Sequence, residues 1–373
     1  MVKNQHRTAI FFLYFCLTLN LLVVLLLLGS YASLYIDPRE AWIFALFGLL
    51  YPYLLIINIL FILLWLILWK KYAWISLIAI AIGWKSLSTI MAFNFTPAIL
   101  PPVQNFSLIT YNIHNFNGHN DIKRNVRGEI TEFIAGEQPD ILCLQEFSIQ
   151  EADGEPAYRK MMTAWHMPYR YFEPYYKSDR QLPVNGIATF SKHPIIGHGF
   201  LGKYPAQCFG IFTDITFHQD TVRIFNIHLA SVRLNKKEMD LYNQLTNKEN
   251  EKVLWKENVF NIVKKLKRAF LLHSQQLDQL MGVMNDSPYP VVICGDLNDT
   301  PISYTYRKLT RRFKDVFREA GKGFLGNTYA GFFPPSRIDY IFHDRLLSAY
   351  AYRKMKITFS DHYPVYCLLV VEK

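Results

Sequence analysis

The first hundred residues hold the feature that most limits how this chain can fold. Residues 9–36 and 41–69 contain no charged side chain. A helix needs about 20 apolar residues to cross a bilayer, so each stretch is long enough to span one. A cleavable signal peptide would have a shorter apolar core, and further spans would not follow it. The sequence therefore predicts a membrane-anchored protein.

The number of spans depends on two further segments. Residues 41–69 form either one span or a short re-entrant piece followed by a span, because Pro52 can kink a helix. Residues 73–93 form a third candidate, which Lys85 interrupts. We expect Lys85 to extend its amine to the membrane interface, since a charge at depth is costly. Three spans are the predicted arrangement.

Positive charges near the spans predict the orientation. Lys3 and Arg7 precede the first span, and Lys70 and Lys71 follow the second, so both sets belong on the cytoplasmic side. Three spans then place everything after Pro101 on the non-cytoplasmic side. A hairpin in the second segment would reverse this. We predict an integral protein of a bacterial inner membrane, with its soluble domain on the non-cytoplasmic side.

Composition changes abruptly along the chain and predicts three regions. Residues 1–95 form the membrane region, residues 96–105 a linker with three prolines, and residues 106–373 a soluble domain. The net charge of +10 fits an anionic partner, although lysines beside membrane spans contribute to it. The five cysteines fit no zinc pattern.

Short apolar runs in the soluble region predict a mixed α/β sheet protein. Helical spacing is found in "NVRGEITEFIAGEQPD" and "FLLHSQQLDQLMGVM". The runs that predict strands are "FSLITYNIH", "ILCLQEF", "GIATFSKHPI", "IFTDITF", "VRIFNIHLA", "VVICGDLN", "RIDYIFH" and "YPVYCLLVV".

Polar side chains gather where these predicted strands end or begin. Acids, amides and imidazoles at the tips of apolar strands indicate one convergent pocket. The residues are Asn112, Glu146, His228, Asp296, Asn298, Asp339, Asp361 and His362.

An ordered set of six segments resembles the endonuclease/exonuclease/phosphatase superfamily, which includes deoxyribonuclease I and neutral sphingomyelinases. The segments are "YNIHNFNG", "PDILCLQEF", "NGIATFSKHPI", "NIHLAS", "GDLNDTP" and "SDHYPV". The resemblance covers nearly all of residues 106–373 and implies a four-layer α/β/β/α sandwich. It also implies a hydrolase that cleaves phosphate esters with a divalent metal.

The resemblance implies a metal role for three residues. Glu146 is the expected main ligand, and Asn112 either supports the same metal or binds the phosphate. Asp361 is expected to bind the same or a second metal. These oxygen ligands favour Mg²⁺ or Mn²⁺.

The resemblance also implies catalytic and substrate-binding roles. Asp296 is the expected general base for the attacking water, although metal binding is an alternative role for it. His362, paired with Asp339, is expected to contact the scissile phosphate. His228 would protonate the leaving oxygen or stabilise the transition state.

Two asparagines complete the expected site. Asn298 should point the same way as Asp296 if the segment is extended, and would hold the phosphate or orient that base. Asn185 either reaches the phosphate or forms a turn with Gly186.

The substrate is left open among three classes: a lipid headgroup ester, nucleic acid, and a soluble phosphate ester including monoesters. Membrane anchoring favours the lipid. The lysine-rich residues 236–268 are either a basic surface element for anionic headgroups or a solvated helix. Residues 169–176, "YRYFEPYY", line a pocket or membrane-facing rim, or pack in the core. A non-enzymatic membrane scaffold is a further alternative, but such a chain would usually have lost some of the acidic residues that are present here. The sequence indicates no obligate protein partner.

Overall fold

The structure, a computed structural model, describes residues 2–94, 105–118, 124–149, 154–176, 184–202, 208–217, 219–232, 251–330 and 336–372. The chain divides into two compact units. The first comprises Met1–Thr89, Leu234–Ser274 and Thr300–Arg307, and the second comprises Ile90–Arg233, Gln275–Asp299 and Lys308–Lys373. Residues 96–104 of the predicted linker and 236–250 of the lysine-rich segment lie outside the described residues.

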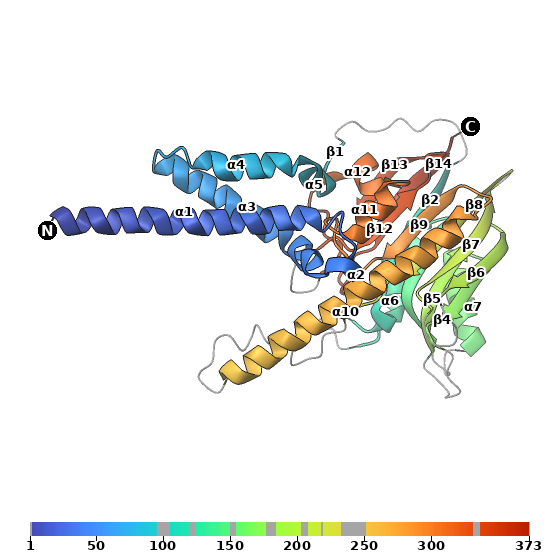
Figure 1. Ribbon diagram of the computed structural model, residues 1–373. Coiled ribbons are helices and arrows are strands. Elements are labelled where there is room, and N and C mark those ends of the chain that lie inside the picture. Colours follow the sequence, from blue (N-terminus) through green and yellow to red (C-terminus); the bar gives the residue numbers. More distant parts are fainter. Residues whose placement is uncertain are drawn as a thin grey trace. The chain divides into compact units, whose positions relative to one another are not determined.

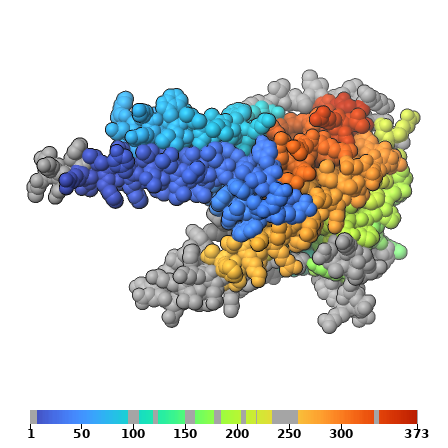
Figure 2. Space-filling model, viewed as in Figure 1, coloured from blue at the N-terminus to red at the C-terminus, as the bar shows by residue number. Residues whose placement is uncertain are grey.

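The first unit is built on apolar helices, of which α1, α3 and α4 run side by side (Figure 1; Figure 2). Within the described residues, two helices are long and apolar enough to cross a membrane, covering Arg7–Ala32 and Ile43–Ile67. The helices are α1 (Val2–Ala32), α2 (Pro38–Ala41), α3 (Ile43–Ile67), α4 (Ala73–Ile82) and α5 (Trp84–Thr89).

The structure decides between the two forms expected for the second apolar segment. α3 is one helix that continues through Pro52, so this segment forms neither a hairpin nor a re-entrant piece. The third apolar segment, expected as one span over residues 73–93, forms two short helices, α4 and α5, with Gly83 between them, and its last residues, Met91–Phe93, form a strand of the second unit instead. Lys85 lies exposed in α5, consistent with an amine that reaches polar surroundings.

A buried polar contact joins the three long apolar segments. The Trp65 indole donates to Asn20 Oδ1 at 2.9 Å, and Asn20 Nδ2 donates to Ser76 Oγ at 2.7 Å. Because all three side chains are buried, the hydrogen bonds offset the cost of removing these polar groups from water.

The connection between α1 and α3 contacts two segments from far along the chain. Ser33 Oγ donates to the carbonyl oxygen of Ile302 at 2.9 Å. The Lys267 ammonium lies 5.4 Å from the centre of the Trp42 ring. Both contacts therefore join parts of the first unit that are far apart in the sequence.

The second unit contains two six-stranded sheets flanked by helices (Figure 1). One sheet has the order β10-β12-β9-β8-β7-β6, and the other β13-β14-β2-β3-β5-β4. The strands are β2 (Asn105–Asn112), β3 (Ile141–Ile149), β4 (Tyr169–Pro174), β5 (Val184–Ser191), β6 (Ile195–Leu201), β7 (Gly210–Phe217), β8 (Asp220–His228), β9 (Val291–Asp296), β10 (Lys314–Asp315), β12 (Asp339–His343), β13 (Leu347–Lys354) and β14 (Val365–Val371).

Short helices and a small ribbon complete this unit. β1 (Met91–Phe93) pairs with β11 (Lys322–Phe324) as a separate two-stranded sheet. The long helix α10 contributes residues to both units. The helices are η1 (His114–Phe116), α6 (Arg127–Glu137), α7 (Gly154–Trp165), α10 (Glu251–Asn285), α11 (Tyr304–Thr310) and α12 (Val316–Ala320).

The main core lies between the two sheets. Leu108 and Cys143 of one sheet pack in the same cluster as Ile224 and Cys294 of the other, and all four are fully buried. Strand alternation sends the remaining apolar side chains to the outer face, where they pack with Ile130 and other residues of α6 and α7. The predicted sandwich architecture of two sheets with flanking helices is therefore confirmed.

Each sheet contains one parallel strand pair, and these pairs position the polar residues. β2 pairs with β3, and β8 with β9; the other strand pairs in the two sheets are antiparallel among the described residues. Gly295 in β9 has a φ of +130°, and a Cβ there would lie 2.0 Å from the Ile227 carbonyl oxygen. Only glycine therefore allows β9 to approach β8 at this point.

Most predicted strands are observed, with some differences. The run "GIATFSKHPI" was expected as one strand, but it ends β5 and begins β6, because Ser191–Pro194 turn the chain between the two sheets. The short strands β1, β10 and β11 were not predicted, and neither were β4 and β13. β4 and β13 lie at the two edges of the same sheet, where half-buried residues weaken the apolar pattern.

Candidate functional site

The carboxyl ends of the two parallel pairs bring four of the predicted residues together. His228 and Asp296 are the last residues of β8 and β9 and are partners in the strand register. Asn112 ends β2 and lies opposite Gln145, next to Glu146. Asn112 Nδ2 lies 3.1 Å from Asp296 Oδ2 and 3.4 Å from Glu146 Oε1, so the two sheets contribute to one cluster.

His362 forms a buried pair with Asp339, as the sequence predicted. His362 Nδ1 lies 2.9 Å from Asp339 Oδ2, and its Nε2 lies 3.6 Å from Asp296 Oδ2. Burial disfavours the imidazolium, but the carboxylates of Asp339 and Asp296 outweigh burial and raise the pKa of His362 to about 10. The two carboxylates therefore favour the imidazolium form of His362.

Asp296 lies at the centre of this cluster and is almost completely buried. Burial raises the pKa of its carboxyl, His362 opposes that rise, and Asp339 adds to it. Its Oδ1 accepts the backbone N–H of Asn298 at 2.8 Å, so Oδ2 is the oxygen that faces His228, His362 and Asn112.

A local distortion of β3 positions Glu146. The register between β3 and β5 shifts between Leu144 and Phe147, and Glu146 has a φ of +50°. Such a bulge turns a side chain out of the regular alternation and is common beside functional sites. Glu146 Oε2 accepts a hydrogen bond from Asn115 Nδ2 at 3.1 Å, which leaves Oε1 facing Asn112 and His228.

The orientation of the Asn112 amide differs from that of a metal ligand, one of its two expected roles. Its Oδ1 accepts the backbone N–H of His114 at 3.1 Å, so its NH₂ group faces the carboxylates of Glu146 and Asp296. In this orientation Asn112 is a donor that holds the two carboxylates, whereas a metal ligand would present its oxygen.

Tyr175 connects Glu146 with His228. The backbone N–H of Glu146 donates to the Tyr175 hydroxyl oxygen at 2.9 Å, and that hydroxyl lies 2.8 Å from His228 Nδ1. The hydroxyl oxygen accepts the amide proton, and its own proton can go to Nδ1 of His228, an arrangement that leaves an imidazole proton on Nε2. Burial raises the pKa of Tyr175 well above its usual value, which keeps that proton in place.

The Nε2 of His228 consequently points a donor into the cluster. It lies 3.7 Å from both Glu146 Oε1 and Asp296 Oδ2, beyond hydrogen-bond distance. It is buried and has no hydrogen-bond partner among the described residues. A buried N–H without a partner is costly, so an acceptor from a ligand would satisfy it.

Three predicted residues lie differently from the expectation. The segment at Asn298 is not extended, because β9 ends at Asp296 and Asn298 has a φ of +49°; its Nδ2 donates to the Leu229 carbonyl oxygen at 3.0 Å. Asp361 lies at the rim, with its Oδ1 3.2 Å from Ser360 Oγ. Asn185 is exposed in β5, and no hydrogen bond joins its side chain to the cluster within the described part of the chain.

Four residues near the cluster were not predicted. Tyr175 and Asn115 contact Glu146 directly, as described above. The Tyr329 ring packs edge-on against His362 with centroids 5.2 Å apart, and Ser360 Oγ donates to the Asn112 carbonyl oxygen at 2.7 Å. The sequence held signals for three of them: Asn115 and Ser360 lie in the segments "YNIHNFNG" and "SDHYPV", and Tyr175 lies in the aromatic run at residues 169–176.

The donor set fits a hard divalent cation. Asp296, Asp339 and His362 offer ligand atoms that lie within 4.8 Å of one another, so this group could hold a metal ion. Asp339 Oδ1 is buried and has no hydrogen-bond partner among the described residues. Glu146 Oε1 and Asp296 Oδ2 face the same cluster, where both accept from Asn112 Nδ2, so a cation held by these two oxygens would replace that amide as their partner.

Comparisons with known proteins agree with this geometry. Residues 109–362 match the Endonuclease/Exonuclease/phosphatase family, and residues 11–90 match a domain of unknown function (DUF8431). A search of curated proteins finds no match.

Solved structures share the sandwich at low identity. An endonuclease/exonuclease/phosphatase from Beutenbergia cavernae DSM 12333 is 18% identical, with a TM-score of 0.50 over 72% of each chain. The human Nocturnin catalytic domain, solved with a bound sulfate anion, is 17% identical, with a TM-score of 0.50 over 73% of this chain and 96% of that chain. The fold and the family match over residues 109–362 lead to one conclusion: this chain belongs to the endonuclease/exonuclease/phosphatase family, whose chemistry is hydrolysis of phosphoester bonds.

Proposed function

We propose that the chain is a membrane-anchored phosphodiesterase that requires Mg²⁺ or Mn²⁺ and hydrolyses a lipid headgroup ester. The observation that carries the proposal is the convergence of Glu146, Asp296, His228 and His362 at the strand ends of both sheets. Glu146 would hold the cation, with Asp296 or Asp361 as a further ligand. The bound cation would neutralise charge on the phosphoryl oxygens.

The chain's own residues supply the other requirements of the reaction. Asp296 accepts a proton from the attacking water, with Oδ2 as the facing oxygen. The charged His362, held by Asp339, donates from Nε2 to a phosphoryl oxygen. His228 donates from Nε2 to the phosphate or the leaving oxygen, and Asn112 keeps the two carboxylates in place. Such preorganised donors stabilise the charge that develops in the transition state.

Replacing Tyr175 with phenylalanine tests how His228 is held. Tyr175→Phe keeps the ring but removes the proton that fixes the His228 tautomer, so we expect turnover to fall about tenfold or more. The change also leaves the Glu146 N–H without its acceptor, at a cost of about 1–3 kcal/mol in the free energy of unfolding. Nitrogen NMR of the His228 ring should show a shift from the Nε2–H form to a mixture.

The exposed Tyr169 provides the matched control for this change. Tyr169→Phe should leave both turnover and the His228 spectrum unchanged. An unaltered His228 tautomer in Tyr175→Phe would contradict the positioning role.

The surface of the helices supports membrane anchoring. Only 28% of the most apolar 18-residue window in α1 is buried, and 33% of that in α3, whereas the core helix of a soluble protein is mostly buried. Phe11 and Ile67 are 72% and 74% exposed. Exposing this much apolar surface is energetically favourable in lipid and unfavourable in water.

Contacts of the α1–α3 connection support the three-span arrangement. If the N-terminus is cytoplasmic, this connection lies on the non-cytoplasmic side, and Ser33 contacts Ile302, which follows the motif of Asp296. With only two spans, Ser33 would lie on the non-cytoplasmic side and Ile302 on the cytoplasmic side, so the two residues could not be in contact. α4 and α5 together would therefore form the third crossing, about 25 Å long at 1.5 Å per residue.

Labelling with a membrane-impermeant maleimide tests this topology. In intact spheroplasts, Glu40→Cys and Lys160→Cys should both react, and Lys70→Cys should react only after the membrane is opened. The unsubstituted chain measures background from its native cysteines. If Lys160→Cys reacts only after the membrane is opened, as Lys70→Cys does, the orientation is the reverse of the predicted one.

The substrate class is tested with the detergent-purified full chain. With Mg²⁺ we expect release of a phosphorylated headgroup from phospholipid or sphingolipid vesicles, and no release with chelator. Plasmid nicking serves as the second assay, because the basic net charge also fits nucleic acid. Plasmid nicking without headgroup release would contradict the lipid proposal and indicate a membrane-tethered nuclease. If neither activity is found and the protein binds no metal, the chain is a non-enzymatic scaffold.

A further inference from the structure

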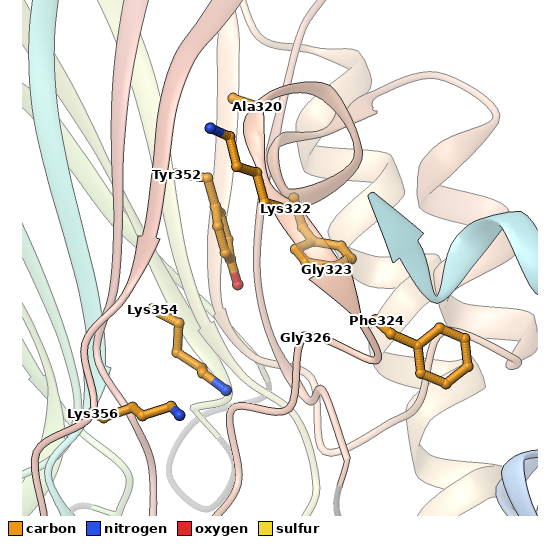
Figure 3. A pocket seen from close by; sticks show the side chains of 9 residues that line it. Ala320, Lys322, Gly323, Phe324, Gly326, Tyr352, Lys354 and Lys356 are labelled. Atoms are coloured by element: carbon orange, nitrogen blue, oxygen red, sulfur yellow. The ribbon is translucent and has the colours of Figure 1, made fainter. Parts of the chain in front are cut away.

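A basic cavity lies in the second unit, lined by residues that belong neither to the cluster described above nor to its neighbours. It has a volume of about 480 Å³ and lies between α12, the ribbon strand β11 and the edge strand β13 (Figure 3). Its lining includes Lys322, Lys354 and Lys356 and no acidic residue among those described. A cavity of this size can hold a small phosphorylated molecule or a lipid headgroup.

Two of the lysines converge on one side of the cavity. Figure 3 shows the amines of Lys354 and Lys356 on the side toward which the Tyr352 hydroxyl points, whereas the Lys322 amine is directed toward Ala320. Lys354 Nζ donates to the Asn327 carbonyl oxygen at 2.6 Å, and it lies 5.4 Å from the centre of the Tyr363 ring. These contacts fix its ammonium while leaving other N–H donors available.

Among the described residues, no acidic side chain lines the cavity to balance its positive charge. None of the three lysines forms a salt bridge with another described residue. Burial and the neighbouring Lys356 both lower the pKa of Lys354, as expected for two ammonium groups that repel each other. The Tyr352 hydroxyl is buried and lacks a hydrogen-bond partner in the part of the chain that the structure describes. An anion with several acceptor oxygens would satisfy the lysines, and a small movement of Lys354 would also give that hydroxyl a partner.

We propose that this cavity binds a phosphate group through Lys354 and Lys356, separately from the site of hydrolysis. A phosphate has the charge and the acceptor oxygens that two lysine ammonium groups require. Bound there, the ligand would tie β13 to the ribbon formed by β1 and β11.

The position of the ribbon in the sequence indicates an anionic phospholipid as the source of that phosphate, and this step rests on the proposed membrane anchoring. Phe93 in β1 and Phe324 in β11 are 60% and 52% exposed, and aromatic side chains are common at the level of lipid headgroups. α5 ends at Thr89, and four residues of backbone reach at most about 14 Å, so Phe93 stays near the end of the apolar region. Phosphate in solution is the other source with the same chemistry.

Thermal unfolding of the full chain in detergent tests the site without turnover. Chelator is present throughout, so that no metal holds phosphate at the hydrolytic cluster. Saturating inorganic phosphate should raise the midpoint by about 2–4 °C. The double variant Lys354→Gln/Lys356→Gln should lose this shift, and Lys160→Gln, an exposed lysine of α7, should keep it. Lys356→Gln alone repeats the test with an exposed side chain.

Nanodiscs distinguish the two sources of phosphate. Adding phosphatidylglycerol to phosphatidylcholine discs should raise the midpoint of the wild type and of Lys160→Gln, but not that of the double variant. If inorganic phosphate raises the midpoint through the two lysines but phosphatidylglycerol does not, the ligand is a soluble phosphate and the proposed lipid source is wrong. Equal shifts in the double variant and the wild type would overturn the site itself. Because neither arm measures hydrolysis, failure of the proposed enzymatic function would leave these results interpretable.

Discussion

Asp296→Asn should reduce phosphodiester turnover by at least about 10²-fold while the protein stays folded. The amide keeps the shape of the side chain but cannot take a proton from water, and general bases typically contribute about 10²–10⁴-fold. The hydrogen bond from the Asn298 N–H to Oδ1 can persist with an amide oxygen. The loss should therefore appear in kcat rather than in the melting temperature.

Asp286, an exposed residue after α10, provides the control for this change. Asp286→Asn should retain wild-type turnover. More than a tenth of wild-type activity in Asp296→Asn, measured under metal saturation, would contradict the role of Asp296 as the base.

Glu146→Gln should remove most of the affinity for the divalent cation. Glutamine can still accept the hydrogen bond from Asn115, so the local structure should persist. It lacks the negative charge that a hard cation requires, and even outer-shell changes cost about 10–100-fold in affinity, so we expect a loss of about 100-fold or more. Calorimetric titration with Mn²⁺ measures the change.

Glu132, exposed on α6, is the matched control. Glu132→Gln should bind Mn²⁺ as the wild type does. Unchanged affinity in Glu146→Gln would show that the cation is held elsewhere, for example by Asp339 and His362, whose ligand atoms lie close to Asp296.

The sequence predicted the strand tips because the physical signal there is local. An apolar run that ends in Asp296 or His228 marks the point where a buried strand leaves the core. The pairing of Asp339 with His362 was also predicted, and the structure confirms it at 2.9 Å. The individual roles of these residues in hydrolysis stay predictions.

The parts that the sequence could not show depend on contacts between distant segments. The bulge at Glu146 exists because β3 pairs with β5, and the alternation of "ILCLQEF" alone places its side chain differently. Tyr175 reaches His228 only because β4 lies beside β5 at the edge of the sheet. Asn298 was expected in an extended segment, but its backbone turns where β9 ends, and its amide binds Leu229.

The central claim is that residues from both sheets surround one divalent cation. A crystal of the full chain soaked in Mn²⁺, examined by anomalous scattering, measures this directly. We expect a single strong peak between the strand ends, with a Glu146 oxygen about 2.0–2.6 Å from the ion and Asp296 beside it. A peak remote from Glu146, or no peak between the two sheets at saturating Mn²⁺, would contradict the proposed hydrolase.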